Sequence, residues 1–151
     1  MNDSARFRKH DPAFRWEGVE TRAYKNDPGV PYRDVTRQVL FDDPALRCEL
    51  RYFEVAPGGY TTLERHEHVH AVVIQRGRGR VLVGDAIANV MPFDLVRVPP
   101  RTWHQFRADE DACLGFLCLV NHERDRPELP DAAALAALRE TAEIAAFIRT
   151  E

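Results

Sequence analysis

The sequence has few cysteines and none of the spacings that would make them a metal site. Cys48, Cys113 and Cys118 are the three cysteines among 151 residues, and no CxxC pair occurs. This odd, widely spaced set predicts neither a disulfide framework nor a cysteine-rich zinc site. Reduced thiols buried in the core are the simplest interpretation, and they indicate a reducing, cytoplasmic compartment.

Long hydrophobic runs and an excess of positive charge are also absent. The first twenty residues contain no apolar signal segment, and no run approaches the ~18 apolar residues of a membrane span. The formal net charge of -3 argues against a nucleic acid or an anionic membrane as partner. With 44% hydrophobic and 30% charged residues, the composition is that of a globular protein, and the length favours one domain.

Short apolar segments separated by turn signals make up the middle of the chain. The clearest alternates over residues 46–55, with Leu50 and Tyr52 on one face and Glu49 and Arg51 on the other. Strands are predicted at residues 35–41, 46–55, 71–75, 80–83, 90–91, 95–98, 103–107 and 113–120, with turns at 42–44 and 57–59. Turn signals about every ten residues predict a β-sandwich or barrel.

The two ends of the chain differ from this middle part. Residues 1–33 are polar and contain several prolines, which predicts an irregular arm that Trp16 and Tyr24 attach to the domain. After Pro130 the sequence is rich in Ala, Leu and Glu, and Asp131 can cap a helix. Apolar residues then recur at helical spacing, at Leu135, Leu138, Ile144, Phe147 and Ile148. They predict one or two short helices that pack on the barrel or on a partner subunit.

The segment HEHVH, residues 66–70, allows two interpretations. As H-E-x-x-H on a helix it would be the zinc motif of a metalloprotease, with Glu67 as general base. The flanking residues oppose a helix, because Gly58 and Gly59 precede the motif and Val72, Val73 and Ile74 follow it. The sequence therefore favours an extended chain here.

On an extended chain the alternate residues Glu64, His66, His68 and His70 point to one face. Such a row of polar groups is costly inside a barrel unless a partner satisfies it, and a metal ion does so. The alternatives are a row of histidines facing solvent or a pH-sensitive hydrogen-bonded cluster. His10 and His122 lie in no spaced motif and are assigned to the surface or to packing.

The sequence around these histidines resembles the cupin superfamily. Its first motif, Gly-x5-His-x-His-x3,4-Glu-x6-Gly, is matched in spacing by Gly58-x5-Glu64-x-His66-x3-His70-x6-Gly77. The second is matched by Gly84, Pro92-Phe93-Asp94, Pro99-Pro100 and His104. The resemblance implies an all-β fold, the double-stranded β-helix or jelly-roll barrel. It would span 34–122, with an arm at 1–33 and a helical tail at 123–151 in one domain.

The resemblance also implies a metal site. His66, His70 and His104 would bind one divalent transition metal (Mn, Fe, Ni, Cu or Zn), and Glu64 or His68 would complete the protein ligands. Glu64 stands where the family has its first histidine, and His70 where it has glutamate. Glu67, one step out of phase, would face away. The implied pocket wall is Tyr52, Val72, Ile74 and Phe106.

Three functions fit these features. The first is a metal-dependent enzyme acting on a small molecule, by dioxygenase-type oxidation or by isomerase or lyase chemistry at a Lewis acid. The second is a ligand-binding or sensor protein without turnover, and the third is a metal-free scaffold. The resemblance adds the expectation of a homodimer. Arginines outside the motifs, Arg78, Arg80, Arg97 and Arg101, are assigned to the solvated face.

Overall fold

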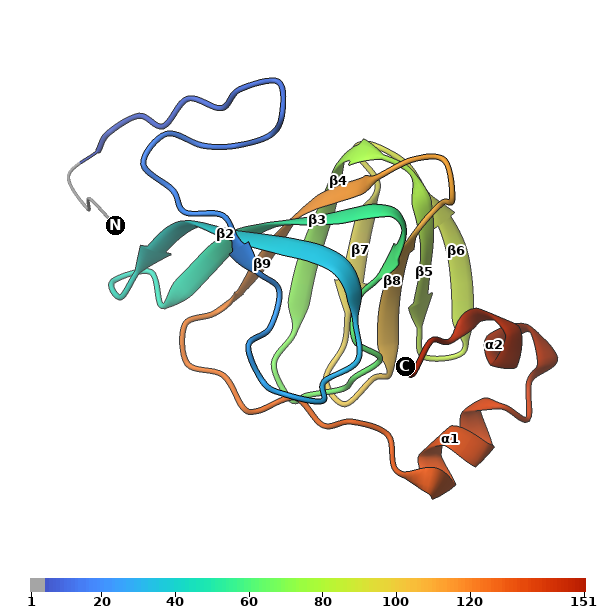
Figure 1. Ribbon diagram of the computed structural model, residues 1–151. Coiled ribbons are helices and arrows are strands. Elements are labelled where there is room, and N and C mark those ends of the chain that lie inside the picture. The colour runs from blue at the N-terminus through green and yellow to red at the C-terminus, as the bar shows by residue number, and fades with distance from the viewer. Residues whose placement is uncertain (1–4) are drawn as a thin grey trace.

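The computed structural model describes residues 5–151 as a curled sheet with a long N-terminal arm and two short C-terminal helices (Figure 1). The strands are β1 Arg22–Ala23, β2 Arg33–Asp43, β3 Cys48–Tyr60, β4 His70–Gly77, β5 Gly79–Val83, β6 Ala86–Val90, β7 Leu95–Val98, β8 His104–Ala108 and β9 Leu114–Asn121. The helices are α1 Ala132–Leu138 and α2 Ala142–Phe147. Within the described chain, neither helix is long and apolar enough to cross a membrane. Residues 1–4 of the predicted arm lie outside the described residues.

The sheet runs in the order β6-β5-β8-β3-β9-β4-β7, and all of its pairs are antiparallel. Strand β3 holds it together, because β3 pairs with β9 along most of its length, with β2 on its other edge and with β8 at Tyr60. The predicted all-β architecture with a helical C-terminal segment is confirmed. Each of the eight predicted strands overlaps one strand from β2 to β9, while β1 was not predicted.

Two apolar clusters make up the core. The larger one fills the inside of the curled sheet and includes Val55, Val72, Ile74 and Leu114, none of which is exposed. The smaller one lies under the C-terminal helices and consists of Leu63, Leu82, Ile144, Phe147 and Ile148. The apolar stripe of the helical tail therefore packs on the barrel, which is one of the two placements that the sequence leaves open. Its first helix begins as expected, since Asp131 Oδ1 accepts a hydrogen bond from the Ala134 amide at 2.8 Å.

The turn predicted at residues 57–59 is wrong, because β3 continues through these residues to Tyr60. Gly58 adopts φ +74°, and its amide donates to the Asp109 carbonyl at 2.9 Å. The pairing with β2 jumps here from Arg33↔Tyr60 to Val35↔Val55, which marks a bulge. A glycine in the left-handed region thus bends the strand without ending it.

The N-terminal arm covers the outer face of β3. The Phe14 and Trp16 rings pack on Tyr52 at centroid distances of 5.7 and 5.0 Å. Gln38 of β2 fixes the arm, since its side chain donates to the Phe14 carbonyl at 2.8 Å and accepts from the Trp16 amide at 3.2 Å. Tyr52 is consequently only 1% exposed although it faces away from the barrel interior.

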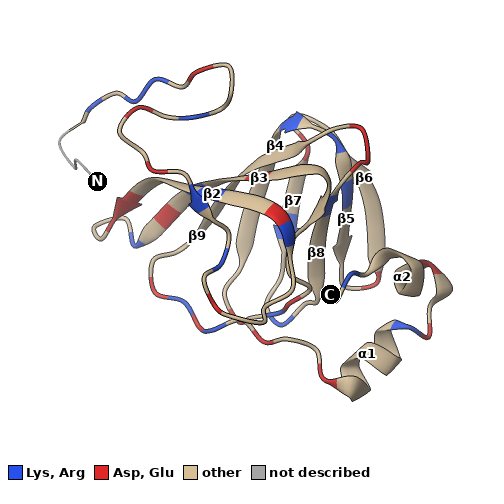
Figure 2. Cartoon of the chain, in the orientation of Figure 1, with Lys and Arg blue, Asp and Glu red and all other residues tan. Residues whose placement is uncertain are grey.

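Charged residues of both signs are spread over the arm, the loops and the strands, whereas α1 carries none (Figure 2). Arg78, Arg80, Arg97 and Arg101 are exposed, as the sequence predicts. Arg78 pairs with Asp109 and Asp111, and Arg101 pairs with Glu67. These pairs lie at the surface, where ion pairs contribute little to stability.

Candidate metal centre

The chain between Glu64 and His70 is neither a helix nor a continuous strand. Glu64 forms a two-way backbone bridge with His104, and β4 begins at His70, but the residues between them bend. Asp125 holds the bend, because its carboxylate accepts from the amides of Glu67 and His68 at 2.8 and 3.1 Å. The helical metalloprotease motif is therefore excluded here, and the extended conformation is present only at the two ends of the segment.

Three histidines meet inside the barrel. His66 comes from the bend, His70 from the start of β4 and His104 from the start of β8. One ring nitrogen of each lies within 4.8 Å of the others. The ring centroids are 4.5 Å apart for His66 and His70, 4.8 Å for His66 and His104, and 5.4 Å for His70 and His104.

Backbone carbonyls fix the tautomers of two of these rings. His66 Nδ1 lies 2.7 Å from the His68 carbonyl, and His104 Nδ1 lies 2.9 Å from the Thr102 carbonyl. Because a carbonyl oxygen can only accept, both Nδ1 atoms carry the proton and donate it. The lone pair of each ring is thereby left on Nε2, which is the arrangement a metal-binding histidine needs.

The free ring nitrogens are buried and have no hydrogen-bond partner. This holds for Nε2 of His66 and of His70. Burial, followed by the neighbouring His104 and His68, lowers the pKa of His66 to about 4. Burial likewise lowers the pKa of His70 and of His104. The rings are thus neutral near pH 7, and orphaned neutral imidazole nitrogens that converge fit a divalent transition metal.

The two remaining predicted ligands lie beside the cluster and have other partners. Glu64 is buried, and its Oε2 forms an ion pair with Lys25 Nζ from the arm. The His68 ring stacks on His66 at 3.7 Å between centroids, and its Nδ1 contacts Asp125 Oδ1 at 2.7 Å. Burial would raise the pKa of Asp125, but its hydrogen bonds with Glu67 and His68 lower it on balance.

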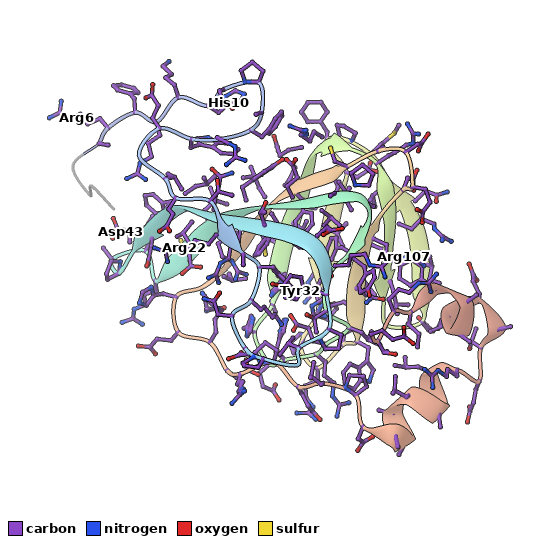
Figure 3. The ribbon with its side chains drawn as sticks, viewed as in Figure 1. Arg6, His10, Arg22, Tyr32, Asp43 and Arg107 are labelled. Atoms are coloured by element: carbon purple, nitrogen blue, oxygen red, sulfur yellow. The ribbon has the colours of Figure 1, made fainter. Side chains whose placement is uncertain are left out.

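His70 and His104 of the cluster line a cavity of about 380 Å³, within the size range of small-molecule sites, whereas His66 does not line it. Its polar lining residues are Lys25, Asn26, Asp27, Arg37, Arg51, Thr61, Glu64, His68, His70, His104, Arg124 and Asp125. Its other lining residues are Tyr24, Phe53, Phe106, Phe116, Cys118 and Pro127. Side chains crowd the space inside the curve of β2 near the labelled Tyr32 (Figure 3), and the Tyr32 hydroxyl donates to the Lys25 carbonyl at 3.0 Å.

The predicted pocket wall is only partly the one in the structure. Phe106 lines the cavity. Val72 and Ile74 are buried in the core and are not among the lining residues, and Tyr52 packs against the arm instead. On β3 the cavity is lined by Arg51 and Phe53, which belong to the opposite face from Tyr52.

Sequence reasoning missed the cationic residues of this site, Lys25, Arg37, Arg51 and Arg124, together with Cys118. They lie in no motif, and the signal that could have found one of them is Phe53, an apolar residue on the same face of the strand as Arg51. The histidines assigned to the surface lie outside the cavity. His10 is on the arm (Figure 3), and His122 pairs with Asp42 at 2.7 Å.

Comparison with known proteins identifies similar chains. The family model described as "Cupin domain" matches residues 51–120. A relative from Rhodospirillum rubrum is 54% identical over 97% of this chain and 94% of its own length, and is named 1-methylthio-D-xylulose 5-phosphate methylsulfurylase. The crystal structure of a cupin 2 conserved barrel domain protein from Rhodopseudomonas palustris is 58% identical, with a TM-score of 0.91 over 95% of this chain and 99% of that one. A cupin 2 domain-containing protein from Halorhodospira halophila is 42% identical, with a TM-score of 0.73 over 94% of each chain.

Proposed function

Because the chain belongs to the cupin family, we propose that it is a metal-dependent enzyme that acts as a methylsulfurylase on 1-methylthio-D-xylulose 5-phosphate or a similar phosphorylated ketose. The substrate comes from the relative that is 54% identical over 97% of this chain. The metal requirement comes from one observation, the three converging histidines, of which His66 and His70 have buried, unpartnered Nε2 atoms. Together they favour an enzyme over the ligand-binding and scaffold hypotheses.

The histidine centre would bind the metal, and the cavity wall would contact the substrate. A bound divalent ion would supply a Lewis acid for the oxygen atoms of the ketose next to the carbon–sulfur bond. His66, His70 and His104 would hold it through Nε2. The carbonyls of His68 and Thr102 keep the proton of the His66 and His104 rings on Nδ1, so that Nε2 is free to bind. Phe53, Phe106 and Phe116 form an apolar wall that excludes water and can contact a methylthio group.

A direct assay tests this function. Protein loaded in turn with Mn, Fe, Ni, Cu or Zn is given 1-methylthio-D-xylulose 5-phosphate, with and without an added thiol as methylthio acceptor. We expect loss of the carbon-bound methylthio signal in the proton spectrum with at least one metal, and none with metal-free protein. Unchanged substrate with every metal would sink the proposal.

The dioxygenase-type reaction predicted from the sequence has no specific observation in its favour, since a three-histidine centre serves several chemistries. Oxygen uptake in the same assay separates the two reactions, because methylthio transfer consumes none. The sensor hypothesis predicts saturable binding without turnover.

Glu64 is the fourth protein ligand in this proposal. It lies beside His104 through their backbone bridge, and its ion pair with Lys25 uses Oε2 and leaves Oε1 for the metal, while the Nδ1 of His68 is engaged by Asp125. We expect Glu64→Gln to weaken metal binding by at least about tenfold and His68→Ala to keep the metal. Elemental analysis of both variants measures this. Metal loss in His68→Ala alone would assign the ligand to His68 instead.

Two further features of the sequence stay proposals. Three unpaired cysteines support a reducing, cytoplasmic location. Large apolar side chains on and beside β7, Met91, Phe93 and Leu95, are more than half exposed, which supports a homodimer through this region. Light scattering on the purified protein measures the oligomeric state.

A further inference from the structure

Three arginines from separate segments line the cavity that holds the histidine centre. Arg37 lies on β2, Arg51 on β3 and Arg124 in the loop after β9. Arg37 pairs across the sheet with Phe53, which is two residues from Arg51, so the first two guanidinium groups emerge on the same, inward face.

Two of these guanidinium groups lack the hydrogen bonds that burial demands. Arg51 is only 8% exposed, yet its Nε has no hydrogen-bond partner, and neither has the buried Nε of Arg37. The polar contacts of Arg51 are long: its Nη2 lies 3.6 Å from Cys118 Sγ, and its Nε lies 3.5 Å from Glu49 Oε1, while its guanidinium group lies 4.9 Å from the centre of the Phe53 ring. Buried donors without acceptors are costly and mark a place where a ligand is expected.

The arginines have few carboxylate partners. Glu49 is the one carboxylate paired with this group, at 3.5 Å from both Arg51 and Arg124 among the described residues. The other nearby acids have different partners: Glu64 pairs with Lys25, Asp27 is exposed at the open rim, and Asp125 accepts hydrogen bonds from the Glu67 and His68 amides. Burial and the repulsion of Arg51 lower the pKa of Arg37, so these two cations lie close enough to repel each other.

From these observations we propose that Arg37, Arg51 and Arg124 form a binding site for the dianionic phosphate of a phosphorylated substrate whose other end meets the histidine centre. The unpartnered guanidinium N–H groups of Arg37 and Arg51 need acceptor atoms, and a phosphate monoester offers three acceptor oxygens and close to two negative charges at pH 7. The assignment deepens the proposed function, on which it rests for the identity of the substrate.

The test compares ligands that differ only in the phosphate. Metal-loaded protein is titrated calorimetrically with D-xylulose 5-phosphate and with D-xylulose, and inorganic phosphate is added as a competitor. We expect the phosphorylated sugar to bind at least about tenfold more tightly, and inorganic phosphate to displace it. Equal affinity for the two sugars would overturn the site.

Single arginine variants then assign the contacts. Arg51→Met and Arg37→Met are each expected to reduce the preference for the phosphorylated sugar by about 10- to 100-fold, because each removes charged hydrogen bonds. Arg97→Met, on the exposed arginine of β7, is the matched control and should keep the preference. Since the readout is a ratio of two affinities in one protein, partial misfolding does not imitate the effect. An unchanged ratio in both Arg51→Met and Arg37→Met would refute the assignment.

The two proposals fail separately in these experiments. Protein that shows no turnover of the methylthio sugar, but loses phosphate preference in Arg51→Met, would keep the phosphate site and lose the methylsulfurylase. Protein that turns over the methylthio sugar without any preference for the phosphate would keep the enzyme and lose the site.

Discussion

Replacing His104 with alanine is expected to remove the metal from the protein and to bring turnover of the methylthio sugar down to that of metal-free protein. Wild-type protein should carry one equivalent of metal, and the variant less than about a tenth of that. The reason is that His104 supplies one of three converging nitrogens, with its Nδ1 proton held by Thr102. Elemental analysis and the substrate assay measure the two effects.

The free energy of unfolding is a second measurement of the effect of His104→Ala. A ligand present at 100 times its dissociation constant stabilises a folded protein by about 2.7 kcal/mol, so added metal should raise the free energy of unfolding of the wild type by roughly this amount. The variant should gain nothing. Because each protein is compared with and without metal, the cavity left by the missing ring does not affect the difference.

His122→Ala is the matched control, since His122 pairs with Asp42 outside the cavity. It should keep both the metal and the metal-dependent stabilisation. If His104→Ala retained a full equivalent of metal, the three-histidine centre would not be the binding site.

Gly77→Ala is expected to destabilise the protein by at least about 4 kcal/mol, a large part of the stability of an ordinary domain. Gly77 ends β4 with φ +71°, and a Cβ there would lie 1.7 Å from the Cys113 carbonyl oxygen. That carbonyl cannot retreat without cost, because it accepts the Arg78 amide at 3.0 Å and belongs to the connection into β9. Urea unfolding measures the loss.

Gly18→Ala separates the cost of the left-handed backbone from the cost of the close contact. Gly18 adopts nearly the same backbone, φ +70°, but a Cβ there would meet nothing within 4 Å. Only the left-handed conformation should then cost stability, about 1 kcal/mol. Equal losses in the two variants would show that the contact with Cys113 contributes nothing.

The three central histidines were predicted through the resemblance to the cupin superfamily, whose two motifs supply His66, His70 and His104, and the structure brings these three residues together. The sequence-based prediction was wrong where residues far away in the chain determine the local conformation. The bend at Glu67 and His68 exists because Asp125, more than fifty residues away, takes up both amides. No local pattern around HEHVH contains that information.

Strand β3 shows a second limit. Alternation of apolar and polar residues separates the two faces of a strand. It shows which face lies inside the barrel only when the other face is exposed to solvent. Here both faces are buried, because the arm covers Tyr52 while Phe53 and Arg51 face the cavity. The apolar side chains of residues 46–52 therefore led to the wrong face being predicted as the inner one, and the arginine that lines the cavity was missed.

The rim of the cavity comes from two segments outside the barrel strands, residues 24–27 of the arm and 124–127 of the loop after β9. Neither contributes to the strand pairing of the barrel. Asn26 and Asp27 on one side and Arg124 on the other can therefore be exchanged while the scaffold stays intact, whereas Lys25 and Asp125 contact Glu64 and the bend beside the histidine centre. Proteins of this architecture can change their substrate range through substitutions in these two short segments. A library randomised at these positions is therefore the place to look for a new specificity.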